Sequence, residues 1–118
     1  MKKVFYLKTC GTCKKIMAEF NLDGWELREI KSAPVTESEL AEMYKLTNSY
    51  EALFSKKSTQ IKAREREIDV KNLKEDDFKG LILDHYSFLK RPVFITDKNI
   101  FAGSDKSNLV KLHQFFGS

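Results

Sequence analysis

The 118-residue chain has only two cysteines, two histidines and two prolines. Two thiols are too few for a disulfide-stapled scaffold, so a hydrophobic core must hold the fold, and the length is sufficient for one. The histidines, His85 and His113, are not separated as zinc ligands are, and we expect no metal site. The sequence also lacks an apolar run of membrane-spanning length.

The chain lacks a strong excess of charge of either sign. It has 21 basic and 17 acidic residues and a formal net charge of +4, which permits an anionic substrate but is too small to favour direct binding of nucleic acid. Met1 is followed by two lysines and a short strand rather than by a signal peptide. No repeat, low-complexity tract or linker is present, so we expect one domain over residues 1–118. We expect it to be a cytoplasmic monomer without membrane contact.

The spacing of apolar residues switches between the period of a strand and that of a helix. The first two strands and the intervening helix have the length of a parallel β-α-β unit. Near the C-terminus, two apolar runs flank a turn at 97–99, which predicts an antiparallel hairpin. The four strands are expected at residues 3–7, 25–30, 93–96 and 100–102.

Helices are predicted from their capping signals. One begins directly after Cys10, and Thr36 with Glu39 forms a capping box that opens another. Residues 36–90 are expected to be mainly helical, and carboxylates at 75–77 begin a helix with Phe78, Leu81 and Ile82 buried. The last helix begins near Asp105, and we expect four of its side chains to point inward: Leu109, Val110, Leu112 and Phe116.

Both cysteines lie in one turn, Cys10-Gly11-Thr12-Cys13, between the first strand and the following helix. A Cys-X-X-Cys pair in that position is typical of a redox-active dithiol. The free N–H groups at the start of a helix stabilise a thiolate, and Lys14 and Lys15 add positive charge. The alternative is that both cysteines are inert, small core residues.

Three short segments carry a resemblance to a known family. The turn at 9–13, Arg91-Pro92-Val93 and Phe101-Ala102-Gly103 resemble the arsenate reductase family linked to glutaredoxin, which also contains the regulator Spx. The resemblance spans the whole chain. It implies an α/β, thioredoxin-like fold, in which a four-stranded mixed sheet has flanking helices and a helical insertion at about residues 36–90.

The resemblance also implies roles for residues. Cys10 is the expected nucleophile, and Cys13 the thiol that resolves the mixed disulfide. Arg91 is the expected catalytic, oxyanion-binding arginine, although a lone arginine is more often a solvated surface charge. Pro92 is expected to follow a cis bond, whereas the residues alone also allow an ordinary trans proline at the start of a strand. Gly11, Thr12 and Pro92 are the expected substrate-binding residues.

Two arginines that the family places around the oxyanion are absent, since Ser55 and Ala102 occupy the matching positions. Arg64 and Arg66 are candidate replacements. The resemblance implies an oxidoreductase that reduces a disulfide or an oxyanion, binds no cofactor, and is recycled by an external thiol donor such as glutathione, glutaredoxin or a thioredoxin-like protein. The alternative is an Spx-like redox sensor that binds RNA polymerase.

Overall fold

The computed structural model describes residues 1–64 and 68–117. The chain divides into two compact units: the first consists of Met1–Pro34 with Arg91–Ser118, and the second of Val35–Lys90. The second unit corresponds to the insertion expected at 36–90. Arg66, one of the candidate replacement cations, lies outside the described residues.

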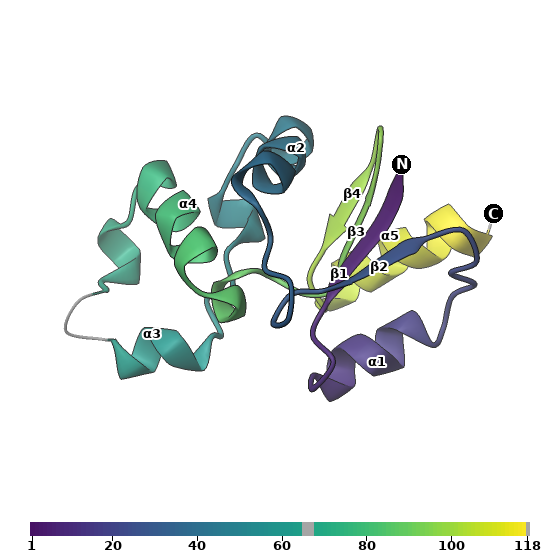
Figure 1. Cartoon of the computed structure of the whole chain (residues 1–118), viewed down its shortest axis with the longest axis horizontal. Coiled ribbons are helices and arrows are strands. Elements are labelled where there is room, and N and C mark those ends of the chain that lie inside the picture. The colour runs from purple at the N-terminus through teal and green to yellow at the C-terminus, as the bar shows by residue number, and fades with distance from the viewer. Residues whose placement is uncertain (65–67, 118) are drawn as a thin grey trace. The chain divides into compact units, whose positions relative to one another are not determined.

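The first unit contains a four-stranded mixed sheet, as expected (Figure 1). β1 pairs in parallel with β2 and antiparallel with β3, and β3 pairs antiparallel with β4. The first strand has the predicted length but lies one residue earlier, and the second is shorter than predicted, because the ladder includes neither Trp25 nor Ile30. The strands, in spatial order, are β2 (Glu26–Glu29), β1 (Lys2–Tyr6), β3 (Val93–Thr96) and β4 (Ile100–Ala102).

Two helices, α1 (Gly11–Met17) and α5 (Lys106–Gly117), pack on the same face of this sheet. Their common core joins Ile16 of α1 and Leu112 of α5 to Val4 and Phe94 of the sheet. An aromatic group surrounds it, in which the ring centroids of Phe20 and Phe116 are 4.6 Å apart and those of Trp25 and Phe116 5.4 Å apart. This core fixes the start of α1, which carries the cysteines, against the sheet.

The prediction of which α5 side chains point inward is wrong for one residue, Val110. Val110 is 49% exposed, whereas Leu112 is fully buried and Leu109 and Phe116 are partly buried. Asn108, which the apolar pattern missed, is buried instead. Residues 108 and 112 are four apart and share a helix face, but residue 110 is two positions from each and so lies on the opposite side.

The second unit is helical in its described residues and adds no strand to the sheet; it contains one isolated β-bridge, Phe54–Leu89. The Thr36–Glu39 capping box is present. Phe78 and Ile82 are buried as expected, but Leu81 is only half-buried. The elements are α2 (Glu37–Thr47), α3 (Thr59–Ala63) and α4 (Glu75–Asp84), with 3-10 turns at Glu51–Leu53, Val70–Asn72 and Tyr86–Phe88.

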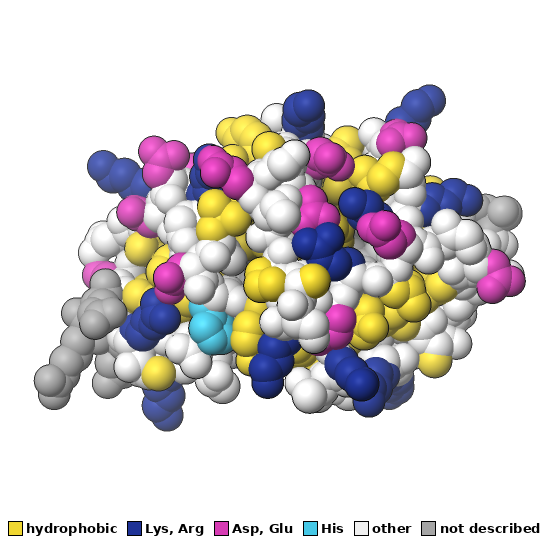
Figure 2. Space-filling model, in the orientation of Figure 1, with side chains coloured by type: hydrophobic (Ala, Val, Ile, Leu, Met, Phe, Trp, Pro, Cys, Tyr) yellow, Lys and Arg dark blue, Asp and Glu magenta, His cyan; other side chains and the backbone are white. Residues whose placement is uncertain are grey.

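Side chains of both charge signs are interspersed over the face drawn in Figure 2. Lysines and arginines do not gather there into one basic field, in keeping with the net charge of +4. Over the described part of the chain, no helix is both long and apolar enough to cross a bilayer.

Candidate active site

The two cysteines lie at the junction between β1 and α1. The chain leaves β1 through a turn in which the Cys10 N–H donates to the Leu7 carbonyl at 3.0 Å. Cys10 is the N-cap of α1, with extended backbone dihedrals, and its carbonyl accepts from the Lys14 N–H at 3.2 Å. The sulfur of Cys10 takes the position of a capping oxygen, accepting from the Cys13 N–H at 3.4 Å.

The two thiols differ in their exposure to solvent. Both are free, but Cys10 is partly exposed whereas Cys13 is fully buried. This difference follows from their positions on α1: the N-cap lies outside the first turn, while Cys13 lies on the same helix face as Ile16, which packs against the sheet. A reactant can therefore reach the sulfur of Cys10 but not that of Cys13.

The pKa values of the two thiols are shifted in opposite directions. Burial by itself raises the pKa of Cys10, but hydrogen bonds from the Cys13 N–H and thiol, together with the charge and hydrogen bond of Arg91, outweigh it and lower that pKa. Burial raises the pKa of Cys13 to about 12; the Leu7 N–H opposes this, and the neighbouring Cys10 adds to it. Near neutral pH, Cys10 is thus the more acidic and more reactive thiol.

Arg91 is the charged side chain that contributes most to the lowered pKa of Cys10. Lys14 and Lys15, which the sequence pointed to as further sources of positive charge, are not among the largest contributions to the lowered pKa of Cys10. Arg91 lies two residues before the start of β3, and β3 lies next to β1 in the sheet. The pairing of Phe5 with Val93 is the last of the β1–β3 ladder, and it brings Arg91 to the end of β1 from which the cysteine turn leaves.

The Arg91–Pro92 bond is cis, which confirms that expectation. Pro92 is buried, and its carbonyl accepts from the Gly103 N–H at 3.0 Å. Gly103 has a φ of 102°, a conformation that side chains with a Cβ rarely adopt. The buried Asn108 amide donates to the Gly103 carbonyl at 2.8 Å, so α5 and the end of β4 together hold the segment beside the cysteine turn.

Gly11 and Thr12 form the first turn of α1, and both are exposed. A Cβ placed on Gly11 would meet no atom within 4 Å. The glycine is thus not required by contacts within the chain. The space above it is open to a molecule that approaches Cys10.

The first unit supplies no cation at the position where the family has a further arginine. Ala102 is the last residue of β4, opposite Val93. In the second unit, the Ser55 N–H donates to the Phe88 carbonyl at 2.7 Å. Arg64, the other candidate replacement, forms an ion pair with Asp84 of its own unit at 2.8 Å.

Two residues that the sequence did not point to form hydrogen bonds with segments next to the site. They are Asn108, described above, and Glu29, whose carboxylate accepts from the Lys8 N–H at 2.8 Å. An asparagine on an otherwise apolar helix face was the available signal for Asn108. No local pattern marked Glu29, because it lies 21 residues from its partner along the chain.

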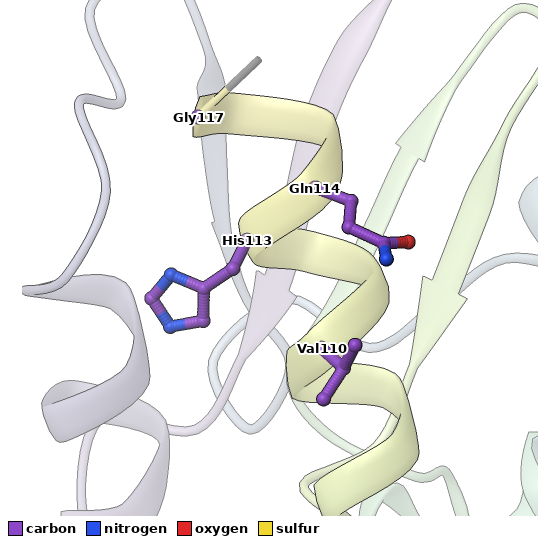
Figure 3. A pocket seen from close by; sticks show the side chains of 4 residues that line it. All are labelled: Val110, His113, Gln114 and Gly117. Carbon is purple, nitrogen blue, oxygen red and sulfur yellow. The ribbon is translucent and has the colours of Figure 1, made fainter.

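A hollow of about 390 Å³ lies elsewhere, on α5, and is lined by Val110, His113, Gln114 and Gly117. His113 projects from the helix on one side and Gln114 on the other (Figure 3). None of these residues carries a thiol, so the redox chemistry of the thiol pair places the candidate site at the cysteine turn. Within the described residues, no three His, Cys, Asp or Glu side chains are grouped as metal ligands would be.

A profile of the ArsC family matches residues 5–112. The chain belongs to the ArsC family. No curated protein matches the chain, but several solved structures share its fold.

One of these structures, described as the YffB (PA3664) protein, has a TM-score of 0.73 and 17% identity, with both chains covered completely. SACOL0876 of Staphylococcus aureus COL has a TM-score of 0.72 and 22% identity, covering 94% of this chain and 97% of its own. An arsenate reductase from Vibrio cholerae has a TM-score of 0.72 and 13% identity, with 93% and 95% covered. These similarities establish the thioredoxin-like fold of this ArsC-family chain.

Proposed function

We propose that this ArsC-family protein is a cytoplasmic, thiol-dependent oxidoreductase in which Cys10 is the nucleophile and Cys13 the resolving thiol. The unequal environments of the two thiols carry the proposal. Cys10 is partly exposed and has a lowered pKa, whereas Cys13 is fully buried and has a pKa of about 12. Thiol–disulfide exchange needs one accessible thiolate to attack and a second thiol close by to complete the reaction.

The first step is attack by the Cys10 thiolate on one sulfur of a disulfide substrate. A bond forms between Cys10 and that sulfur, the substrate S–S bond breaks, and the other half leaves as a thiolate that takes a proton from water. Cys13 then loses its proton, and its sulfur attacks that of Cys10. This releases the second half of the substrate and leaves a Cys10–Cys13 disulfide, so the substrate gains the two electrons that the dithiol loses.

An external thiol donor then reduces the Cys10–Cys13 disulfide by the same exchange and is itself oxidised. Glutathione, a glutaredoxin or a thioredoxin-like protein has the required chemistry. The protein itself needs no bound cofactor for this cycle.

The coupling between the thiols supports this order of events. The hydrogen bond and the charge of Cys10 contribute to the raised pKa of Cys13. Both contributions end when Cys10 becomes part of a mixed disulfide, because its sulfur no longer carries a negative charge. The pKa of Cys13 therefore falls at the step in which Cys13 must ionise.

Arg91 and Pro92 are the proposed substrate-binding groups beside Cys10, together with the open face over Gly11 and Thr12. Arg91 attracts an anionic substrate through charge-assisted hydrogen bonds. Ala102 supplies no second cation in this unit, and each missing charge-assisted bond forgoes roughly 1.5–3 kcal/mol, or about one to two orders of magnitude in affinity. We therefore propose that a disulfide is reduced better than arsenate.

The test compares reduction of arsenate and of a glutathione mixed disulfide by the wild type, Cys10→Ser and Cys13→Ser. We expect turnover of the mixed disulfide to require Cys10. In Cys13→Ser, mass spectrometry should detect a glutathionyl group held on Cys10, because the resolving thiol is missing. Turnover that persists in Cys10→Ser would refute the proposal.

The second candidate function is that of an Spx-like sensor, in which the dithiol controls binding to RNA polymerase. The presence of a second thiol three residues from the first favours it. A protein without turnover that is retained by RNA polymerase, differently in its dithiol and disulfide forms, would support the sensor over the enzyme.

A further inference from the structure

One peptide group lies between Cys10 and an acidic residue that the proposed chemistry does not use. The carbonyl of the Leu7–Lys8 peptide accepts from the Cys10 N–H at 3.0 Å. The N–H of the same peptide donates to Glu29 Oε2 at 2.8 Å. Because a peptide group is planar and stiff, the direction of its N–H determines the direction of its carbonyl.

Glu29 accepts this N–H where the pairing of β1 with β2 ends. Tyr6 is the last β1 residue of the ladder, opposite Glu29, and its carbonyl accepts from the Ile30 N–H at 2.9 Å. The next backbone donor on the β2 side of the chain is the Lys8 N–H, and it donates to the Glu29 side chain instead of to the β2 backbone. The Glu29 carboxylate thus binds the peptide through which the chain leaves the sheet toward Cys10.

The other oxygen of Glu29 is held as well. Oε1 accepts from the Lys31 N–H at 3.0 Å and from the Ser32 N–H at 2.8 Å. These bonds, and first among them that from Lys8, lower the pKa of Glu29 below its ordinary value, so the group is a carboxylate near neutral pH. Its two oxygens therefore bridge the cysteine turn and the loop that follows β2.

We propose that Glu29 is a positioning residue for Cys10, which orients the nucleophile through the Leu7–Lys8 peptide. The backbone of Leu7 also acts to lower the pKa of Cys13, so the residue whose carbonyl accepts from Cys10 influences both thiols. Glu29 acts through the backbone and touches no reactant. The proposal rests on the proposed function in so far as Cys10 is the reacting thiol, but its effect on that thiol is measurable without a substrate.

Glu29→Gln tests this role. A glutamine has the same shape but only one acceptor oxygen, and its NH₂ group would face an N–H donor on one side. The bridge between the two loops must then break at one end. Glu26→Gln is the matched control: it makes the same change on the same strand, at an exposed residue whose carboxylate pairs with Lys3.

The measurement is the pH dependence of Cys10 alkylation by iodoacetamide in the reduced, full-length protein. We expect Glu29→Gln to raise the midpoint by about 0.5 unit, which is about threefold less reaction near pH 7. Glu26→Gln should match the wild type. An unchanged midpoint in Glu29→Gln would overturn the proposal. It would do so even if the variant unfolded more easily, because the hydrogen bond would then contribute to stability alone.

Hydrogen exchange in the wild type provides a test that does not depend on a variant folding. The Lys8 and Cys10 amides should have the same protection factor, since one peptide plane carries both the Lys8 N–H and the carbonyl that accepts from the Cys10 N–H; independent protection would contradict the proposal. The outcomes also separate this inference from the proposed function. A shifted midpoint without turnover refutes only the proposed function, whereas turnover without a shift refutes only the role of Glu29.

Discussion

Replacing Arg91 with methionine removes the positive charge and the hydrogen bond that lower the pKa of Cys10. A hydrogen bond to a charged group contributes roughly 1.5–3 kcal/mol. Cys10 is partly exposed, so solvent screening brings the effect to the lower end of that range. At about 1.4 kcal/mol per unit, we expect the Cys10 pKa to rise by about one unit, with about tenfold less thiolate near neutral pH.

The assay is the rate of Cys10 alkylation as a function of pH, with the modified residue identified by mass spectrometry. Lys15→Met is the matched control, because it removes a charge of the same sign from α1, the helix that Cys10 caps. Its midpoint should equal that of the wild type. Arg91→Lys keeps the charge but loses the planar fork of donors, and its midpoint should lie between those of the wild type and Arg91→Met.

Two results would refute this reasoning. If Arg91→Met titrated as the wild type does, Arg91 would not stabilise the thiolate. If Lys15→Met produced the larger shift, the lysines of α1 would be the dominant charges, as the sequence alone suggested. Circular dichroism at each pH shows that the compared proteins are folded.

Three further predictions concern the same segments. Iodoacetamide should modify Cys10 near neutral pH and leave Cys13 unmodified in the folded protein; modification of Cys13 first would reverse their roles. The pKa of Cys13 is about 12 in the folded protein and lower in the unfolded chain. The neutral thiol therefore stabilises the folded state fully at pH values below the unfolded pKa, and this stabilisation is lost as the pH rises from the unfolded pKa through the folded one. Under reducing conditions, the free energy of unfolding should thus fall by up to about 1.4 kcal/mol per pH unit above pH 9, and Cys13→Ala should remove that slope in urea titrations. Gly103→Ala should lower the free energy of unfolding by about 1–3 kcal/mol because φ is 102° there, whereas Gly11→Ala should leave it within about 1 kcal/mol of the wild type; equal losses would contradict the strain at Gly103.

Features that depend on neighbours in the sequence were predicted well. The capping box at Thr36 and Glu39 and the hairpin at 93–96 and 100–102 have the expected boundaries. Each is determined by hydrogen bonds within a few residues, so the local pattern contains the information. The position of Cys10 at the start of α1 belongs to the same class.

Features that depend on packing were predicted less well. Val110 has the residue type of a core position, yet it lies on the exposed side of α5 because Asn108 and Leu112 define the buried side. Because the polar Asn108 occupies the buried face, that face is rotated by a fraction of a turn from the one that the apolar residues alone predict. The type of residue alone cannot indicate that Asn108 has a partner in the Gly103 carbonyl.

The sequence by itself determined that two thiols lie three residues apart at a strand–helix junction, which provides a potential nucleophile and a potential resolving thiol. Which cysteine is the reactive thiol and which the buried one was decided by the tertiary structure. It buries Cys13 against the sheet, and it brings Arg91 to Cys10 across the antiparallel pairing of β1 and β3. It also brings the Glu29 carboxylate to the Lys8 N–H through the parallel pairing of β1 and β2. A thiol pKa depends on charges and burial in space, and residues distant in the sequence supply both once the sheet has formed.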